Sequence, residues 1–429
     1  MITVLIALFF LLLLTNVPIL FSIGLASMVA LFFFSDMPLV YIPQTMFAST
    51  DSFELLAIPF FILAGGVMKV GGISRRLVDF INTIVGSFTG GLASVTVISC
   101  MFFGAISGSA PATTAAIGSV MIPYMVKKGY DRGFSAALVS CSGGIGIMIP
   151  PSIPAIIYSV LSGTSVASMF AAGIGPGIVV GLVLIAVSYA TARKHNWGGT
   201  KKATWREVAV TAKDAAWALF MPVLILGGIY GGIFTPTEAA AVSVIYSFIV
   251  GVCVYKEIDM KNLKEIIVES AEMTAMVMIL IAVASVFSAI LTEQNVPRML
   301  GESILAGTRN PIAFLLLINL VMLTIGCFMS ITPALIILTP LLVPLLAEFG
   351  INPVHFGQIL VANMAIGALS PPFGVDMFIA CGITKIPIDE YARRGKWVLL
   401  SNLVSLLLIT FIPQIAIFVP RILGMKLGI

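Results

Sequence analysis

Hydrophobic residues fill long stretches of this chain, and polar residues are gathered into the short gaps between them. The apolar stretches lie near residues 2–34, 53–68, 77–126, 133–160, 166–192, 215–255, 272–292, 311–347, 356–383 and 397–420. One helical crossing of a membrane takes roughly 20 apolar residues, so the stretches predict about a dozen membrane-embedded helices or half-helices. They are too long for the strands of a membrane barrel. The pattern therefore predicts an all-α polytopic membrane protein.

Polar and proline-containing breaks interrupt two regions of the chain in the same order. The first region has a small polar segment at 107–111, followed by Pro123, Gly129 and the pair Pro150-Pro151. The second has such a segment at 330–333, followed at matching spacing by Pro344, Gly350 and the pair Pro371-Pro372. Paired broken helices are typical of transporters built from repeats. We therefore predict a first repeat at 1–195, a linker at 196–214 and a second repeat at 215–429.

The distribution of Lys and Arg predicts that the second repeat is inverted relative to the first. The turn after Pro123 contains Lys127, Lys128 and Arg132, whereas the turn after Pro344 contains Glu348 and no basic residue. Lys and Arg collect in short cytoplasmic loops, so these turns are expected on opposite sides of the membrane. Counting crossings from the basic residues after the 53–68 helix then places the linker at 193–213 in the cytoplasm and the C-terminus in the periplasm.

The polar tips within 77–126 and 311–347 either connect two full crossings or close re-entrant hairpins. We favour hairpins, because a glycine-rich polar tip between such apolar sequences is tolerated where it lines a cavity. Freed carbonyl groups at broken helices suit Na⁺, and free N–H groups at half-helix N-termini suit a carboxylate. The repetition therefore predicts two similar Na⁺ sites with the substrate between the tips. The alternative for any single residue is close helix packing.

The candidate site residues come from both copies. The expected Na⁺ ligands are Gly104, Ser107, Ser109, Gly146 and Pro150 in the first copy, and Gly326, Ser330, Thr332, Gly367 and Pro371 in the second. The expected substrate contacts are Thr113, Ser152, Thr332 and Asp376.

Few ionisable residues interrupt the apolar stretches. Asp376 is an acid within an apolar run, and such residues are functional by default, although an interfacial or hydrogen-bonded structural role remains the alternative. Its counterpart in the first copy is Ala155, so any role of Asp376 breaks the symmetry. Glu238 follows Thr235 and Pro236 in the order of a helix start, which predicts a capping role. His195 and His355 are expected in loops on opposite sides of the membrane, where they cannot share a site.

Composition excludes several classes of function. The chain is 59% hydrophobic and 10% charged, with a mean hydropathy of +1.11, whereas soluble domains are roughly a quarter charged. The net charge of +4 comes from basic residues scattered over short loops, so no nucleic-acid partner is expected. The five cysteines lack paired spacing and are expected to be packing residues. No zinc-protease, Walker or nucleophile-elbow motif is present, so we expect no catalytic residues and transport driven by an ion gradient.

Four segments together closely resemble one family, the large membrane subunit (DctM type) of tripartite ATP-independent periplasmic (TRAP) transporters. They are residues 51–61 (Asp-Ser-Phe-Glu-Leu-Leu-Ala-Ile-Pro-Phe-Phe), 104–109 (Gly-Ala-Ile-Ser-Gly-Ser), 149–154 (Ile-Pro-Pro-Ser-Ile-Pro) and 228–240 (Gly-Ile-Tyr-Gly-Gly-Ile-Phe-Thr-Pro-Thr-Glu-Ala-Ala). The resemblance runs over nearly the whole chain.

The resemblance implies Na⁺-coupled secondary uptake of an organic acid across a bacterial inner membrane by an elevator motion. It implies two partners, a periplasmic substrate-binding protein and a small four-helix membrane subunit, which we expect to be a separate polypeptide. The mobile domain would comprise residues 77–165 and 310–385, and the remainder would form the scaffold. Residues 109–114 resemble sialic acid systems, and a C4-dicarboxylate or another sugar acid is the alternative substrate. A cation/proton antiporter or channel is the alternative of a different class, and a membrane-embedded enzyme is a weaker one.

Overall fold

The computed structural model describes residues 1–15, 17–35, 37–371, 374–425 and 427, and within them the chain forms helices and connecting turns without a strand. The first helices are α1 (Ile2–Leu14), α2 (Ile19–Phe34), α3 (Tyr41–Thr50), η1 (Glu54–Leu56), α4 (Ala57–Val70) and α5 (Ile73–Val85). The region of the first double proline contains α6 (Gly91–Ser107), α7 (Ala110–Lys127), α8 (Arg132–Gly143), η2 (Gly144–Ile147) and α9 (Ile153–Ser162). The expected all-α fold is confirmed.

The second half of the chain continues in the same way. Its longer helices come first: α10 (Val166–Lys194), α11 (Trp205–Tyr230), α12 (Pro236–Phe248), the π-helix η3 (Ile249–Val254), α13 (Met260–Glu293) and α14 (Val296–Gly307). The region of the second double proline contains α15 (Pro311–Phe328), α16 (Ile331–Leu346), α17 (Pro353–Gly367), α18 (Val375–Thr384), α19 (Ile388–Phe411) and α20 (Gln414–Ile422). Pro372, the second residue of that double proline, lies outside the described residues.

Helices of two lengths make up the apolar part of the described chain. Six are long and apolar enough to cross a membrane, namely α10, α11, α12 continued by η3, α13, α15 and α19. The pair of α3 and the helix from Glu54 to Val70, bent by 66°, adds a seventh candidate. Shorter apolar helices include α6, α9, α16 and α18. Because a full crossing takes roughly 20 residues, this mixture agrees with the half-helices that the sequence predicts.

The start of α12 illustrates how local sequence sets these boundaries. The Glu238 carboxylate accepts hydrogen bonds from the Thr235 N–H (2.8 Å) and hydroxyl (2.9 Å), and the Glu238 N–H donates to Thr235 Oγ1 (3.3 Å). Pro236 occupies the first helical position, where its missing N–H costs nothing. The reciprocal bonds satisfy backbone donors that the helix leaves free. The capping role expected for Glu238 is therefore confirmed.

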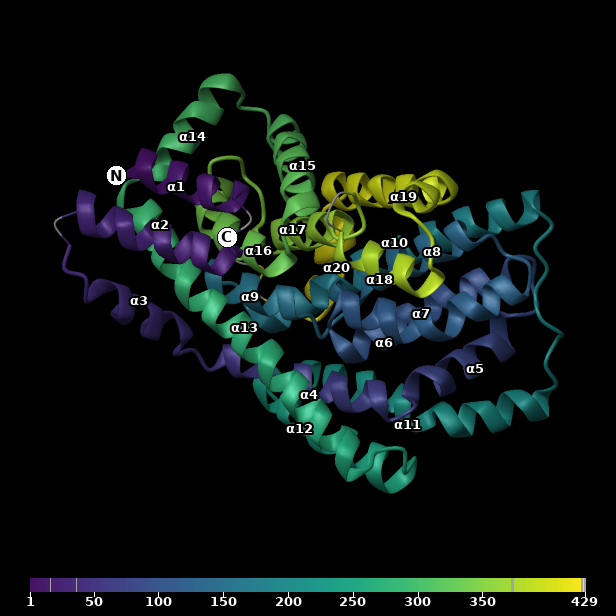
Figure 1. The fold of residues 1–429 in the computed structure, drawn as a ribbon. Helices are drawn as coiled ribbons and strands as arrows, with labels where there is room; N and C mark the ends of the chain where they lie inside the picture. The colour runs from purple at the N-terminus through teal and green to yellow at the C-terminus, as the bar shows by residue number, and fades with distance from the viewer. Residues whose placement is uncertain (16, 36, 372–373, 426, 428–429) are drawn as a thin grey trace.

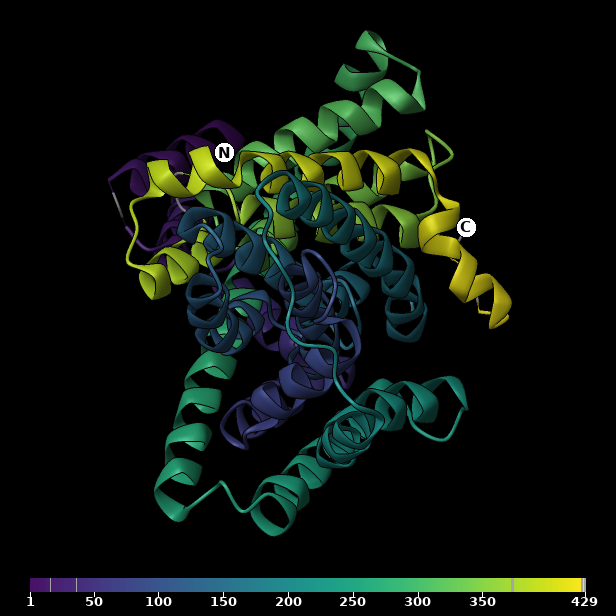
Figure 2. The ribbon, with the colours of Figure 1, turned by 90° about the vertical axis from the view of Figure 1, so that its right-hand side faces the viewer.

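The two broken regions lie next to each other in the middle of the fold. Figure 1 shows α6, α7 and α9 between α4, α11 and α12 on one side and α15 to α19 on the other. In the perpendicular view of Figure 2, the teal helices α11 and α12 lie below this centre and the yellow α19 runs above it.

The packing between the two regions is crosswise. α7 of the first packs against α18 of the second, and α16 of the second packs against α9 of the first. His355 does not lie in a loop, as the sequence suggested, because Asn352 caps the N-terminus of α17 and starts that helix before it. The imidazole is buried, with Nε2 2.9 Å from the Ile409 carbonyl oxygen.

Candidate functional site

The tip of the first hairpin is a tight turn between α6 and α7. α6 ends at Ser107, Gly108 adopts a left-handed φ of +61°, and Ser109 caps α7 by accepting a hydrogen bond from the Ala112 N–H at 3.4 Å. Glycine takes this conformation without a steric cost, so it is the residue that ends a helix in this way. The turn at 107–109 therefore folds residues 91–127 into a helical hairpin.

Oxygen atoms converge at this tip. The Thr113 hydroxyl donates to the Ser109 carbonyl at 2.8 Å and lies 3.0 Å from Ser107 Oγ. The Ser109 N–H in turn donates to Ser107 Oγ at 3.4 Å. Ser107 and Thr113 are buried. Hard cations prefer oxygen ligands, so hydroxyl and carbonyl groups gathered in this way are suited to an ion such as Na⁺.

The first broken helix consists of α8, η2 and α9. The α-helical bonding of α8 stops at Gly143, the chain continues through η2, and Ser152 caps α9 by accepting from the Ala155 N–H at 3.2 Å. The Ser152 hydroxyl donates to the Ile147 carbonyl, so this candidate substrate contact already has two backbone partners. Pro150 and Pro151 lie in the connection between η2 and α9. No helical hydrogen bond is needed there, so the N–H that proline lacks is not missed.

The tip and the break of each copy meet through two glycines. A Cβ atom built on Gly104 would lie 2.4 Å from the Gly146 Cα. In the second copy, a Cβ atom built on Gly367 would lie 2.5 Å from the Gly326 Cα. Side chains are excluded at both contacts, because carbon atoms pack at about 3.5–4.0 Å. The structure therefore brings together four of the predicted site residues as two equivalent pairs.

The second tip is more open than the first. Ser330 precedes α16 but makes no side-chain cap bond, and its side chain is exposed. Thr332 is half-buried, and Pro371 is exposed. The sequence predicts two similar tips, whereas the structure buries Ser107 and Thr113 of the first tip and leaves Ser330 of the second at the surface.

Asp376 lies fully buried in the first turn of α18. Its N–H donates to the Ala368 carbonyl at 3.1 Å, but neither carboxylate oxygen has a hydrogen-bond partner among the described residues. A buried polar group without a partner costs folding free energy. The Asp376 carboxylate therefore gains no stabilisation from hydrogen bonds to the described residues.

Sequence reasoning missed two sets of buried polar residues. Tyr391 of α19 joins the two broken regions, because its hydroxyl lies 2.8 Å from Ser140 Oγ and donates to the Leu369 carbonyl at 3.1 Å. A second set links three helices: the Asn363 amide donates to Asn319 Oδ1 at 2.7 Å, and the Asn319 amide donates to Thr410 Oγ1 at 3.0 Å. Asn319 and Asn363 could have been found, because each stands within a predicted apolar stretch.

The part of the chain that the structure describes contains no group of three or more His, Cys, Asp or Glu side chains suited to a metal ion. The candidate Na⁺ ligands at the tips are hydroxyl and backbone oxygens, and Asp376 remains a candidate substrate contact.

Comparisons with known proteins agree on one family. The model of the tripartite ATP-independent periplasmic transporter, DctM component, matches residues 6–415. The isethionate TRAP transporter permease DctMQ of Oleidesulfovibrio alaskensis is 43% identical, over 96% of this chain and 65% of that protein. The C4-dicarboxylate permease DctM of Pseudomonas aeruginosa is 40% identical over 94% and 95%. The sialic acid permease SiaM of Vibrio cholerae is 35% identical over 96% of each.

The fold also resembles solved structures of low sequence identity. The YdaH transporter of Alcanivorax borkumensis superposes with a TM-score of 0.62 at 14% identity, over 91% of this chain and 90% of that one. The MtrF efflux pump of Neisseria gonorrhoeae gives a TM-score of 0.56 at 12% identity, over 95% of each chain.

Proposed function

The chain belongs to the DctM family of tripartite ATP-independent periplasmic transporters, and on this premise we propose that it catalyses Na⁺-coupled uptake of an organic anion. The protein is a multi-pass membrane transporter rather than an enzyme. The proposal includes two inverted repeats, with the linker at 193–213 in the cytoplasm and the C-terminus in the periplasm. A domain of residues 77–165 and 310–385 would move as an elevator against the remainder.

The proposal of Na⁺ as the coupling ion rests on a contact that both copies contain, between a hairpin and a broken helix. The pairs Gly104–Gly146 and Gly326–Gly367 each bring a helix end against a tip. Backbone groups freed at such ends are suited to ions. We propose one Na⁺ site at Gly104, Ser107, Ser109, Gly146 and Pro150, and a second at Gly326, Ser330, Thr332, Gly367 and Pro371.

The substrates named for the relatives have only a broad chemical class in common. Their names give isethionate, C4-dicarboxylates, 2,3-diketo-L-gulonate and sialic acid, all organic anions. The relatives named for isethionate and C4-dicarboxylates share 43% and 40% identity with this chain, against 35% for the sialic acid permease. We propose a small organic acid as the first candidate substrate. Sialic acid, which the sequence favours at residues 109–114, is the second candidate because the hydroxyl groups of Ser107 and Thr113 suit a polyol acid.

Two protein partners follow from membership of a tripartite family. We propose that a small membrane subunit packs beside this chain and that a periplasmic binding protein delivers the substrate. The substrate would lie between the tips, near Thr113, Ser152, Thr332 and Asp376.

Transport into proteoliposomes tests the proposal. The chain and its small subunit are reconstituted, and uptake of labelled isethionate, succinate and sialic acid is measured with and without an inward Na⁺ gradient and the cognate binding protein. Uptake of one acid that needs both additions is the expected result. Uptake that proceeds without the binding protein and follows a proton gradient instead would favour an antiporter.

The placement of the ions has its own test. Ser107→Trp and Ser330→Trp are expected to weaken the dependence of uptake on Na⁺, because each replaces a serine hydroxyl proposed to bind the ion with a bulky side chain. Ser303→Trp is the control, since Ser303 is exposed on α14 and is not one of the residues proposed to bind Na⁺. Normal Na⁺ dependence in both tip variants would show that the ions bind elsewhere.

A further inference from the structure

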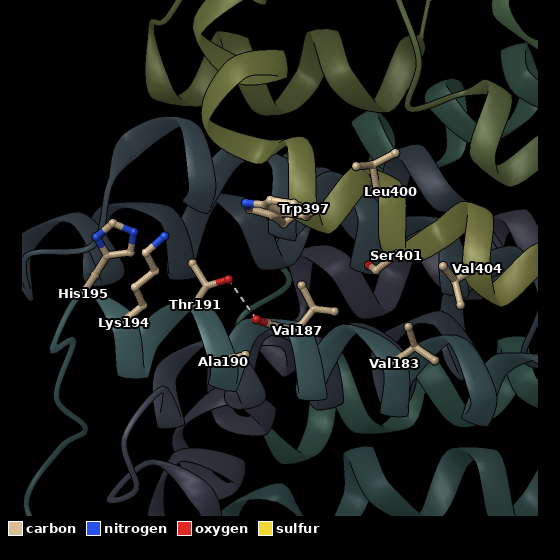
Figure 3. Close-up of a pocket in the computed structure, with 10 residues that line it drawn as sticks. All are labelled: Val183, Val187, Ala190, Thr191, Lys194, His195, Trp397, Leu400, Ser401 and Val404. Carbon is tan, nitrogen blue, oxygen red and sulfur yellow. Dashed lines mark hydrogen bonds between the residues drawn. The ribbon is translucent and has the colours of Figure 1, made fainter.

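A groove runs between α10 and α19 at one end of the molecule. It encloses a cavity of about 540 Å³, and its inner part is lined by apolar side chains, among them Val183, Val187, Leu400 and Val404. Figure 3 shows Val183 on α10 facing Val404 on α19, with Trp397 of α19 nearer the end of the groove where Lys194 and His195 lie. This part of the groove offers no charged group and suits a hydrocarbon chain.

The other end of the groove is basic. This groove adjoins a second cavity of about 650 Å³, because the two share four lining residues: Thr191, Lys194, His195 and Trp397. The adjoining cavity is lined by Lys194, Arg393, Arg394 and Lys396, with Asp131 as its one acidic residue.

Most of this positive charge is uncompensated. Arg394 pairs with Asp131, with Nε and Oδ2 3.6 Å apart. Lys194, Arg393 and Lys396 form no ion pair with any described carboxylate, although the Lys396 ammonium lies 5.4 Å from the centre of the Trp397 ring. Three cationic side chains therefore line a cavity whose one acidic lining residue, Asp131, is already paired with Arg394.

The wall of the basic cavity is aromatic and neutral. The Trp197 ring lies 4.8 Å from the Tyr130 ring and 4.9 Å from the Phe134 ring, measured between centres. Burial raises the pKa of Tyr130 to about 12, so this phenol adds no negative charge near the cations. Tryptophan is enriched where proteins meet the membrane–water interface, which is the depth expected for Trp197 and Trp397.

We propose that this groove binds an anionic glycerophospholipid. The acyl chain lies between α10 and α19 along Val183 and Val404, and the phosphate contacts Lys194, Arg393 and Lys396. Basic pockets between membrane helices on the cytoplasmic side bind such head groups. The distribution of Lys and Arg assigns this end to the cytoplasmic leaflet. A soluble phosphate would use the cations but not the apolar groove that continues from them, so the shape favours a lipid.

Native mass spectrometry of the purified chain with its small membrane subunit tests the proposal. Dissociation constants are compared for phosphatidylglycerol, cardiolipin and zwitterionic phosphatidylcholine. Each Lys or Arg near a lipid head group contributes about fivefold in affinity, so Lys194→Gln combined with Lys396→Gln is expected to weaken binding of phosphatidylglycerol about 30-fold. Lys201→Gln with Lys202→Gln is the matched control, because it removes the same charge from exposed positions in the linker.

Three results would overturn the proposal. One is equal loss in the control pair, which would reflect the overall charge of the protein rather than this groove. Another is phosphatidylglycerol with short acyl chains, or inorganic phosphate, binding as tightly as the long-chain lipid, because the apolar part would then be unused. The third is unchanged binding in the Lys194 and Lys396 variant when its thermal unfolding matches that of the wild type.

Discussion

Replacing Gly104 by Ala tests whether the hairpin tip and the broken helix must touch through their backbones. The added Cβ would lie 2.4 Å from the Gly146 Cα. Carbon atoms pack at about 3.5–4.0 Å, so α6 and η2 must separate by about 1.1–1.6 Å. The obstacle is main chain, so no side chain can rotate away to relieve the contact.

The expected loss of folding free energy in Gly104→Ala follows from two opposing effects. Overpacking a close contact costs about 1–3 kcal/mol. Alanine in a helix is favoured over glycine by about 1 kcal/mol, which offsets part of that cost. Because both partners here are backbone, we expect the overpacking to be at the upper end and Gly104→Ala to be destabilising by about 2 kcal/mol.

The assay is thermal unfolding of the purified protein together with uptake in proteoliposomes. Gly382→Ala is the matched control, because Gly382 is helical in α18 and a Cβ there would meet nothing within 4 Å. The control should unfold at the wild-type temperature or above it. Gly367→Ala should behave like Gly104→Ala, since its Cβ would lie 2.5 Å from the Gly326 Cα.

The reasoning would be refuted by a Gly104→Ala variant that unfolds at the temperature of the Gly382→Ala control and transports normally. That result would mean that the tip can move away from the break without consequence. Loss of stability in Gly104→Ala but not in Gly367→Ala would instead limit the close contact to the first copy.

Three further predictions use the same measurements. Thr235→Ala removes the hydroxyl that caps α12 and should destabilise the protein by about 0.5–2 kcal/mol; an unchanged unfolding temperature would contradict the importance of this cap. Tyr391→Phe leaves the Leu369 carbonyl without its donor and should cost about 1–3 kcal/mol, and no loss would show that water replaces the phenol. Asp376→Asn should abolish uptake while leaving the unfolding temperature unchanged or higher, because the buried carboxylate has no described partner; normal uptake would remove Asp376 from the site.

The sequence predicts those parts of the site that depend on local chemistry. Gly108 between two serines predicts the turn of the first hairpin, because few other residues end a helix in a left-handed conformation. Thr235, Pro236 and Glu238 predict the start of α12 for a similar reason. The matched spacing of prolines and glycines in the two copies also identifies both members of each close glycine pair as site residues.

Contacts between distant segments could not be predicted in this way. The Tyr391 hydroxyl bonds to Ser140 and Leu369, and nothing in the sequence near Tyr391 indicates either partner. The different exposure of Ser107 and Ser330 is equally hidden, since both lie in similar polar tips. His355 was misplaced because its neighbours Asn352 and Pro353 resemble a loop, although together they start α17.

The crosswise packing of the two broken regions has a consequence for biogenesis. α7 and α9 are synthesised and inserted well before α16 and α18, the helices that pack on them, leave the ribosome. Domains generally fold as units while the chain is being made, but here α7 and α9 of the first half complete their packing only with helices of the second half. α7 and α9 therefore remain incompletely packed in the bilayer until α16 and α18 are inserted. The centre of the transporter forms only near the end of translation.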